Sequence, residues 1–586
     1  MEEKNLTGYA SIDKPWLKWF SQEQLDFEFT PMSMFQMMKR HNEGHEQEIA
    51  LSYFGNKISY KKLFDKIEDT ARALLALGIK KGAIVMMSLP NIPEAAYVFY
   101  AVNRIGAILN TFDPRTSIDV IKQDILESNS KCLIIVDVIY PKIKDILKDT
   151  PITDTVLVSP YFSLPFVLRC AVNLKQKPVK YPSEITKWND FLCKGKEFTE
   201  TIPDIFEAGQ LAVICHTGGS TGTPKGVMLS NESCNALIYQ LLYTNYGFRR
   251  NRTFLNILPP FIALGLINAT HLALCAGIQS ILIPSFEPED IPNLIMKHKP
   301  NIFMGGPIHF NMMLNDPKMQ KEDLSYLELC CAGGDKMPRE TQIKIQQFLE
   351  NHHSNAKIWI GYGATETSAG TACMNNHCFK YESVGVPYLH NIFEVFDVDT
   401  GEKIKGYGNV GELRVSSPTL MLGYFGSKAT ETPSAIHTDD DGRCWYCTGD
   451  LGHIDEDGLI YIDGRIKRII TRRGFKIYPL YIEELILQHP AVKNCAVVGV
   501  PDEVELNIPV ANIVLHEECK DKEQEVIEYI NRTIKDQLPE YSLMAGYNFL
   551  EELPLTPIGK LDFKALEKLG IMSNADKRMQ NRFTLS

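Results

Sequence analysis

The stretch "LAVICHTGGSTGTPKG", residues 211–226, places a short apolar run directly before a loop rich in glycine and hydroxyl side chains. The run has the length and the β-branched content of a buried strand. Glycine permits positive φ angles and a close approach of the backbone, so successive N–H groups in such a loop can converge on an anion. We therefore expect a strand over residues 211–216, followed by a loop that holds phosphate groups.

The spacing within this loop argues against the P-loop of Walker-type ATPases and kinases. That motif places glycine directly before its lysine and serine or threonine directly after it. Here Pro224 precedes Lys225 and Gly226 follows it, so the hydroxyl that binds Mg²⁺ in a P-loop is missing. The loop needs another explanation.

Other short apolar runs alternate with longer segments of helical periodicity. They lie at residues 131–137, 279–283, 301–306, 327–334 and 357–363. Buried strands that alternate with helices are typical of β–α units in a mostly parallel sheet. The predicted fold class is therefore α/β, and 586 residues suffice for a large domain of α/β subdomains plus at least one further domain.

The pattern changes near residue 391, where turns rich in Asp and Gly predict hairpins and a small β subdomain that ends near Gly464. Two helical and two strand-like segments then predict a smaller α+β domain. The predicted organisation is a large N-terminal domain over residues 1–464, a hinge over 465–467, a C-terminal domain over 468–572 and a tail over 573–586.

Composition limits the partners and the location. Lys and Arg number 61 against 72 Asp and Glu, a formal charge of −11, which does not suit non-specific binding of nucleic acid. The 14 cysteines are scattered as in proteins with reduced thiols. No signal peptide and no run of about 18 apolar residues is seen, so we expect a cytoplasmic protein.

Residues 161–177 complicate this location. The segment combines apolar bulk with Arg169, Lys175 and Lys177, as a helix on a bilayer surface would. A helix buried against the core is the favoured interpretation. Peripheral contact with a membrane is left open.

The loop and four further motifs resemble the signatures of the acyl- and aminoacyl-adenylating enzymes, a family that includes acyl-CoA synthetases, firefly luciferase and peptide-synthetase adenylation domains. The resemblance is strongest to fatty acyl-CoA synthetases and extends over nearly the whole chain. The motifs occur in family order as "GGSTGTPKG" at 218–226, "YGATE" at 362–366, "TGD" at 448–450, "GRIK" at 464–467 and "PLTPIGK" at 554–560.

The resemblance implies two sets of residues that act on ATP. The nucleotide site would comprise Thr217, Gly218, Gly219, Ser220, Thr221, Gly222, Thr223, Gly226, Gly333, Gly334, Tyr362, Gly363, Asp450 and Arg465. The catalytic residues would be Lys225, Thr365, Glu366 and Lys560. Tyr362 would stack on adenine, Asp450 would accept the ribose hydroxyls, and Glu366 would bind Mg²⁺. Lys560 would bridge the attacking carboxylate and the α-phosphate.

The same resemblance implies a mobile C-terminal domain that rotates about a hinge at Lys467 for the second half-reaction. Rotation would bring a coenzyme A site to the acyl-AMP, formed by Arg473, Gly474, Phe475 and Lys476. Gly474 would leave room for the pantetheine arm, which we favour over a glycine required only by a turn. With Arg472, the basic side chains would suit the coenzyme A phosphates.

The acid is predicted to bind an apolar pocket that includes Phe261, Ile262 and Gly265. Enzymes of this family that take amino acids commonly have Asp where Ile262 stands, and an apolar side chain cannot pair with a buried ammonium. Many acyl- and aryl-CoA ligases have His there, so Ile262 departs from them too. Gly265, Gly333 and Gly334 look like walls of a roomy slot. A fatty acid fits best, and an aromatic or sterol-like acid stays an alternative.

The leading hypothesis is therefore an ATP-dependent ligase that joins a medium- or long-chain fatty acid to coenzyme A, with ATP, Mg²⁺ and coenzyme A as cosubstrates and cofactors. A second hypothesis is an acyl-AMP ligase that loads the thiol of a carrier protein. The third, from another class, is a non-catalytic relative that senses acyl groups or nucleotides. Lys560, Glu366 and the intact loop argue against the third, because a pure binder needs no group placed for phosphoryl chemistry. Oligomeric state is not predicted.

Overall fold

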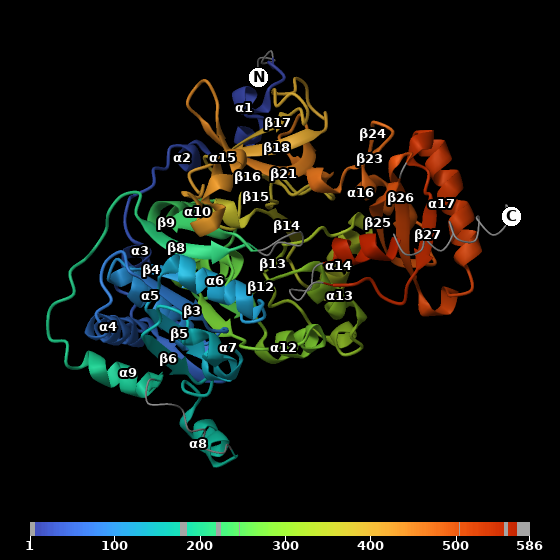
Figure 1. Ribbon diagram of the computed structural model, residues 1–586. Coiled ribbons are helices and arrows are strands. Elements are labelled where there is room, and N and C mark those ends of the chain that lie inside the picture. The colour runs from blue at the N-terminus through green and yellow to red at the C-terminus, as the bar shows by residue number, and fades with distance from the viewer. Residues whose placement is uncertain are drawn as a thin grey trace.

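The computed structural model describes residues 6–175, 185–217, 224–244, 246–502, 504–555 and 561–570. The N-terminal part contains two helix-covered sheets and a smaller β subdomain, and a separate domain follows toward the C-terminal end (Figure 1). This architecture confirms the predicted α/β class with its β subdomain and smaller α+β domain. The exact domain limits stay predictions.

The first sheet contains most of the motif-bearing strands, in the order β16–β15–β14–β13–β12–β10–β11–β1–β2. Neighbours from β14 to β1 run parallel, as the alternating strand and helix pattern predicts. The bounds are β1 (Ile49–Tyr53), β2 (Asn56–Ser59), β10 (Thr253–Asn256), β11 (Gln279–Leu282), β12 (Ile302–Gly305), β13 (Leu329–Ala332), β14 (Ile358–Tyr362), β15 (Ala372–Cys373) and β16 (Val386–Pro387).

The second sheet has the order β19–β9–β8–β4–β3–β5–β6–β7. Every residue of its strand "CLIIV" is buried, which is the apolar continuity expected of a parallel strand covered on both faces. The bounds are β3 (Ile84–Ser88), β4 (Ile108–Thr111), β5 (Cys132–Val136), β6 (Asp154–Val158), β7 (Ile185–Lys187), β8 (Leu211–His216), β9 (Gly226–Ser230) and β19 (Gly423–Tyr424).

Helices α3, α5, α10 and α11 contact one another between the two sheets, with α5 against β4, α10 against β9 and α11 against β11. Helix α5 is buried almost all round, as its apolar sequence requires. The helices of this part are α1 (Ala10–Asp13), α2 (Gln22–Leu25), α3 (Met34–His41), α4 (Tyr60–Ala76), α5 (Pro93–Arg104), α6 (Ile118–Ser128), α7 (Tyr140–Leu147), α8 (Phe166–Lys175), α9 (Trp188–Gly195), α10 (Asn231–Tyr243), α11 (Leu272–Cys275), α12 (Ile291–His298), α13 (Pro307–Asn315), α14 (Arg339–Asn351), α15 (Thr432–Ala435) and the π-helix η3 (Leu264–His271).

The β subdomain is an antiparallel sheet in the order β17–β18–β21–β20, with β22 paired to β21. Its hairpins follow the Asp- and Gly-rich turns read from the sequence. The bounds are β17 (Ile392–Phe396), β18 (Gly411–Ser416), β20 (Ile436–Thr438), β21 (Cys444–Ile454) and β22 (Ile460–Arg465).

The C-terminal domain has its own apolar cores, separate from that of the large domain. Its sheet runs β24–β23–β26–β25, with β27 beside β26, and helices pack against it. The bounds are β23 (Ile470–Arg472), β24 (Phe475–Ile477), α16 (Pro479–Leu487), β25 (Val492–Asp502), β26 (Leu506–Leu515), α17 (Glu523–Gln537) and β27 (Gly546–Phe549).

The favoured burial of the segment over residues 161–177 is wrong. Helix α8 projects from the lower end of the large domain, and Phe166 is 71% and Val167 76% exposed (Figure 1). Val172 is the described apolar side chain of α8 that packs, partly buried, against the core. No helix within the described residues is long and apolar enough to span a membrane.

Glu94, in the first turn of α5, is fully buried, and its Oε1 accepts a hydrogen bond of 2.5 Å from the Ser163 hydroxyl. Burial raises the pKa of Glu94 from 4.5 to about 7, although Ser163 favours the charged form. Between pH 4.5 and about 7, Glu94 is therefore mostly protonated in the folded protein and mostly ionised in the unfolded chain.

We expect the free energy of unfolding to fall as the pH rises from about 5 to 8, by up to about 3 kcal/mol from Glu94 alone. The Glu94→Gln variant lacks this titration, so its stability should change less with pH over that range. Urea denaturation of both proteins at a series of pH values measures the difference. Parallel curves would contradict the assignment.

Candidate functional site

The β8–β9 hairpin presents the glycine-rich loop at the edge of the second sheet. Thr217 and Lys225 close its base, since Thr217 N donates to Lys225 O at 2.9 Å and Lys225 N donates to Thr217 Oγ1 at 3.1 Å. Ser230 then ends β9 and caps α10 by accepting from Ser233 N at 3.0 Å. Loop base, strand and helix are thus one continuous unit.

The predicted phosphate-binding residues between these two anchors lie outside the described residues. They are Gly218, Gly219, Ser220, Thr221, Gly222 and Thr223. Their roles stay predictions. Gly226, directly after the base, is buried, and a Cβ there would lie 3.1 Å from Ile214 Cγ2 and Phe425 Cβ, so close packing favours glycine.

The ammonium of Lys225 is held in place by two residues that the sequence did not single out. Its Nζ lies 2.6 Å from Glu431 Oε2 and 4.5 Å from the centroid of the Tyr424 ring. Hydrogen bonds from Lys225 and Lys428 lower the pKa of Glu431 to about 2. Strand β19 brings Tyr424 to this point by pairing antiparallel with β9.

Tyr424 also contacts Glu366. Its hydroxyl donates to Glu366 Oε1 at 2.8 Å, and Glu366 is only 8% exposed. The ring face of Tyr424 therefore meets the Lys225 cation while its hydroxyl meets the Glu366 carboxylate. One aromatic side chain links the loop base to the turn after β14.

The turn that carries Glu366 has a constrained backbone. Thr365 and Glu366 form the 3₁₀ turn η6 (Thr365–Thr367), with Thr365 half-buried. Ser368 and Ala369 follow with φ of +57° and +103°, which non-glycine residues seldom adopt. A Cβ at Gly363 would lie 2.1 Å from Ala369 O, so that position requires glycine. The turn fixes Glu366 at the carboxyl end of β14.

Asp450, Tyr362 and Arg465 meet beside this turn. The Tyr362 hydroxyl donates to Asp450 Oδ2 at 2.6 Å, and Arg465 Nε lies 2.8 Å from Asp450 Oδ1. The second contact is an ion pair without hydrogen-bond geometry, so the buried Oδ1 has no donor among the described residues. Burial raises the pKa of Asp450, although the Arg465 charge and the Tyr362 hydroxyl oppose the shift. This leaves an acceptor suited to a ligand hydroxyl.

Gly333 and Gly334 directly follow β13, which pairs parallel with β14. Tyr362 is the last residue of β14, so all three residues lie at the carboxyl ends of these strands. Open α/β sheets bind ligands at this edge. Gly334 has φ +84° and open space around it, and Gly333 N donates to Gly305 O at 3.2 Å. Gly333 and Gly334 thus lie at the same strand edge as Tyr362, and their role in binding a nucleotide stays a prediction.

Glu366 is the described residue best suited to a divalent cation at this site. Within the described ranges no group of three His, Cys, Asp or Glu side chains could hold a metal alone. Mg²⁺ is typically bound by one or two carboxylates together with substrate phosphates, and a nearly buried carboxylate beside the loop base fits that pattern. The residues present therefore suit a cation that arrives with a nucleotide.

The predicted acid-binding residues lie where the first sheet meets η3. Phe261 is buried, its carbonyl accepts from the Thr111 hydroxyl at 3.1 Å, and Ile262 lies partly exposed just before η3. A Cβ at Gly265 would lie 1.9 Å from Pro259 O, and its place in the wall of an acid pocket stays a prediction. Close packing against Pro259 explains this glycine.

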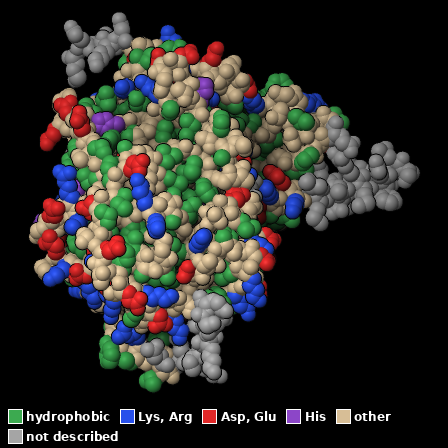
Figure 2. Space-filling view, turned by 60° about the vertical axis from the view of Figure 1, so that its left-hand side comes forward, with side chains coloured by type: hydrophobic (Ala, Val, Ile, Leu, Met, Phe, Trp, Pro, Cys, Tyr) green, Lys and Arg blue, Asp and Glu red, His purple; other side chains and the backbone are tan. Residues whose placement is uncertain are grey.

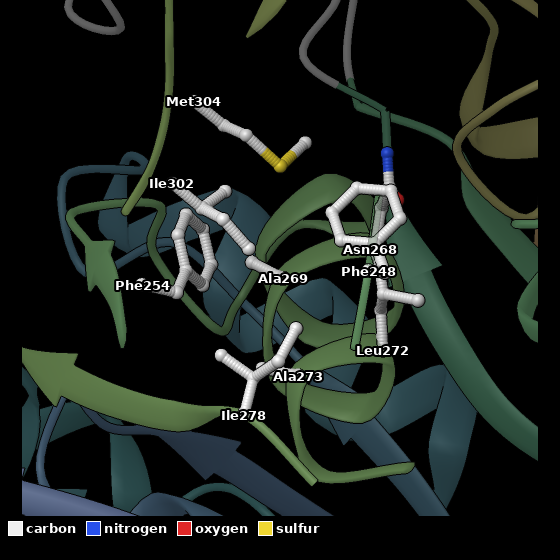
Figure 3. A pocket seen from close by; sticks show the side chains of 9 residues that line it. All are labelled: Phe248, Phe254, Asn268, Ala269, Leu272, Ala273, Ile278, Ile302 and Met304. Carbon is white, nitrogen blue, oxygen red and sulfur yellow. The ribbon is translucent and has the colours of Figure 1, made fainter. Parts of the chain in front are cut away.

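A narrow crevice lies between η3, α11 and the strands β10 and β12 (Figure 3). It is too narrow in this structure for a water molecule, so a ligand there must displace side chains. The buried Asn268 Oδ1 has no hydrogen-bond partner among the described residues. The crevice is lined by Phe248, Phe254, Asn268, Ala269, Leu272, Ala273, Ile278, Ile302 and Met304.

Comparison with known proteins agrees with this geometry. A family model described as AMP-binding enzyme matches residues 38–425, and one described as AMP-binding enzyme C-terminal domain matches residues 481–560. The chain belongs to the AMP-binding enzyme family. The resemblance seen in the sequence motifs is thereby confirmed.

Two curated members of the family and one solved structure illustrate the relationship. The "Long-chain-fatty-acid--CoA ligase" of Bacillus subtilis (strain 168) is 30% identical over 87% of this chain and 90% of its own length. The "4-coumarate--CoA ligase-like 2" of Arabidopsis thaliana is 28% identical over 88% and 86%. ATP-bound MatB from Rhodopseudomonas palustris, at 23% identity, covers 92% of this chain and 99% of its own with a TM-score of 0.78, which shows a shared fold.

These relatives place the chain among the adenylate-forming acyl- and aryl-CoA ligases of the AMP-binding family. The hinge residue expected from the family, Lys467, is exposed in the turn η8 (Ile466–Arg468), between β22 of the large domain and β23 of the C-terminal domain. Lys560, predicted to act in adenylation, lies outside the described residues.

The predicted coenzyme A residues form the β23–β24 hairpin, away from the nucleotide site. Arg473 and Gly474 make its turn with φ of +49° and +85°, and a Cβ added at Gly474 would have no neighbouring atom within 4 Å. Positive φ suffices to explain this glycine in the described orientation, and the channel in the rotated orientation stays a prediction. The assignment to coenzyme A stays a prediction.

In this structure the basic side chains of the hairpin form ion pairs with Asp and Glu side chains. Lys476 Nζ lies 2.7 Å from Asp399 Oδ1 of the large domain. Arg472 Nε lies 2.6 Å from Glu505 Oε2, and Arg473 pairs with the same carboxylate. Coenzyme A phosphates would have to replace these carboxylates as partners.

Proposed function

We propose that the protein is an ATP-dependent acyl-CoA ligase that activates a medium- or long-chain fatty acid as acyl-AMP and transfers the acyl group to coenzyme A. The observation that carries the proposal is the meeting of Lys225, Tyr424 and Glu366 beside the loop base, with Asp450 of the β subdomain held nearby by the Tyr362 hydroxyl. This set offers a cation, a metal-binding carboxylate and a ribose acceptor for one nucleotide.

We infer one orientation for ATP on these groups. The ribose hydroxyls would donate to Asp450, whose Oδ1 lacks a donor among the described residues, and this places the triphosphate toward Lys225 and Glu366. Lys225 would neutralise phosphate charge, since its present partner Glu431 is partly exposed and exchangeable. Mg²⁺ bound with the phosphates would neutralise more of that charge through Glu366.

The first half-reaction joins a carboxylate oxygen of the acid to the α-phosphorus of ATP. The bond from that phosphorus to the pyrophosphate oxygen breaks, and pyrophosphate leaves with its electron pair. In the second half-reaction the coenzyme A sulfur bonds to the acyl carbon, its thiol proton is released and AMP leaves. The chain's own contribution is to position both reactants and to stabilise the developing charge.

The lining of the crevice beside η3 favours a fatty acid over a charged one. Eight of its nine lining residues are apolar or aromatic, and no charged side chain lines it. An alkyl chain gains about 0.8 kcal/mol for each buried CH₂, whereas an ammonium would be buried without a partner. The B. subtilis relative, whose printed name specifies long-chain fatty acids, points the same way.

A ring-hydroxylated aromatic acid is the second candidate. Asn268 lines the crevice, and its Oδ1 is buried without a hydrogen-bond donor among the described residues. A phenolic hydroxyl would satisfy it. The A. thaliana relative carries 4-coumarate in its printed name.

A panel of acids separates the two candidates. With alkyl carboxylates from acetate to palmitate we expect kcat/KM to rise about fourfold for each added CH₂ until the pocket is full. Cinnamate, 4-coumarate and phenylalanine should be poorer substrates. The measurement is coenzyme A thioester formation, with pyrophosphate release followed in parallel.

The panel also defines what would contradict the proposal. A preference for 4-coumarate over both cinnamate and alkyl acids, lost in an Asn268→Leu variant, would establish the second candidate. A preference for phenylalanine would refute the interpretation of Ile262. Pyrophosphate release without consumption of coenzyme A would instead assign the acyl-AMP to a carrier-protein thiol.

A further inference from the structure

Helix α8 exposes an apolar surface at the far end of the large domain from the nucleotide site (Figure 1). Phe166, Val167 and Leu174 are 71%, 76% and 88% exposed, and Leu168 is exposed as well. The lowest part of the molecule in Figure 2 is apolar accordingly, with Lys and Arg side chains frequent just above it and acidic ones among them. We name Phe166, Val167, Leu168 and Leu174 the α8 patch.

The segment that leads into the α8 patch is fixed to the core. The Tyr53 hydroxyl donates to Pro160 O at 2.7 Å, and Asn56 Nδ2 donates to Ser163 O at 2.8 Å. The Ser163 hydroxyl donates to the buried Glu94 at 2.5 Å. The apolar side chains are thus held out from the body by a well-anchored base.

A cavity of about 260 Å³ lies between this segment and α4. Three cationic side chains line it, Lys62 and Lys66 from α4 and Arg169 from α8, beside apolar walls that include Phe162 and Phe166. Lys66 pairs with Asp69 at 3.0 Å, whereas Lys62 and Arg169 have no acidic partner among the described residues. The cavity therefore has a net positive charge at the foot of the α8 patch.

We infer that the α8 patch and the cavity beneath it dock the protein on a bilayer that contains anionic phospholipid. The exposed Phe, Val and Leu side chains of this short helix would be buried at the boundary between the lipid headgroups and acyl chains, as in interfacial helices. Lys62 and Arg169 then face the headgroups, and the cavity has the charge to take a lipid phosphate. Together, the apolar α8 patch and the cationic cavity beside it match a bilayer, in which acyl chains lie next to charged headgroups.

This docking site lies apart from the residues that handle ATP, so vesicle binding and adenylation can be measured separately. In flotation with phosphatidylcholine vesicles, with and without phosphatidylglycerol, the wild-type protein should bind chiefly the anionic vesicles. The variant Phe166→Ser/Val167→Ser/Leu168→Ser should lose binding by about tenfold or more. Lys62→Gln/Lys66→Gln should lose about tenfold on anionic vesicles.

Val504→Ser is the matched control, because Val504 is an apolar side chain 80% exposed on the C-terminal domain. It should bind vesicles as the wild type does. All variants should retain pyrophosphate exchange with a water-soluble acid, which shows that they are folded and that failure of docking is separate from failure of the proposed activity.

Three outcomes would overturn the inference. One is a wild-type protein that stays unbound with anionic vesicles, and another is a triple serine variant that binds as well as the wild type. The third is sedimentation that shows a wild-type dimer, converted to a monomer by the triple substitution, since a second copy of the chain would then cover the α8 patch.

Discussion

The Glu366→Gln variant is expected to lose about 10²–10³-fold in the rate of ATP–pyrophosphate exchange. Glutamine keeps the size of the side chain and an oxygen that can accept from the Tyr424 hydroxyl, now at 2.8 Å. It removes the negative charge that would hold a cation on the phosphates. Exchange measured with saturating acid isolates the adenylation step.

Two comparisons make this result specific. Tyr424→Phe keeps the ring against Lys225 and removes one hydrogen bond to Glu366, so a loss of about tenfold or less is expected. Thioester formation from supplied acyl-AMP should stay near the wild-type rate in Glu366→Gln, because that step involves no triphosphate. Wild-type exchange in Glu366→Gln would refute the metal-binding role.

Sequence predicted the long buried strands because burial on both faces leaves an unbroken apolar run. Strand β5 is such a case, with every residue buried. The two-residue strands β15, β16 and β19 have no such run, since they exist only through pairing with neighbouring strands. Missing these short strands from the sequence matters, because the pairing of β19 with β9 positions Tyr424 in the site.

The site was predictable where motifs specify residue types and not where tertiary pairing brings residues together. Tyr362, Asp450 and Arg465 were expected in one nucleotide site, and the structure brings them into contact. Tyr424 and Glu431 lie in a segment with no spacing relation to Lys225, so no pattern linked them to it. Which residues make up the full nucleotide site stays a prediction, because most of the glycine-rich loop and Lys560 lie outside the described residues.

Glycines and amphipathic segments are hard to assign from sequence for a common physical reason. A glycine can be required by open space, by close packing or by positive φ, and in this structure Gly265 packs closely while Gly474 has positive φ. An apolar helix with basic residues suits either a core or a surface. Whether other elements already fill the core decides between them, and that is a property of the whole fold.

Asp450→Asn is expected to lower kcat/KM for ATP by about 10²-fold, with a smaller effect on the KM for the acid. The reason is that two ribose hydroxyls would lose a charged acceptor, each such hydrogen bond contributing roughly 1.5–3 kcal/mol. Because burial raises the pKa of Asp450, the wild-type kcat/KM for ATP should also decline on acidification at a higher pH than an ordinary aspartate would cause. The variant should lack that limb of the profile.

Asp463→Asn is the matched control for this substitution. Asp463 lies on β22, the strand that pairs with the Asp450-bearing β21, and its Oδ2 contacts His453 Nδ1 at 2.7 Å outside the nucleotide site. It loses the same charge in the same sheet, so an effect on ATP of about threefold or less is expected. Equal losses in both variants, with matching falls in Tm, would mean that Asp450 serves the sheet and not the ribose. A large loss confined to Asp450→Asn, at unchanged Tm, ties the Asp450 carboxylate to the nucleotide.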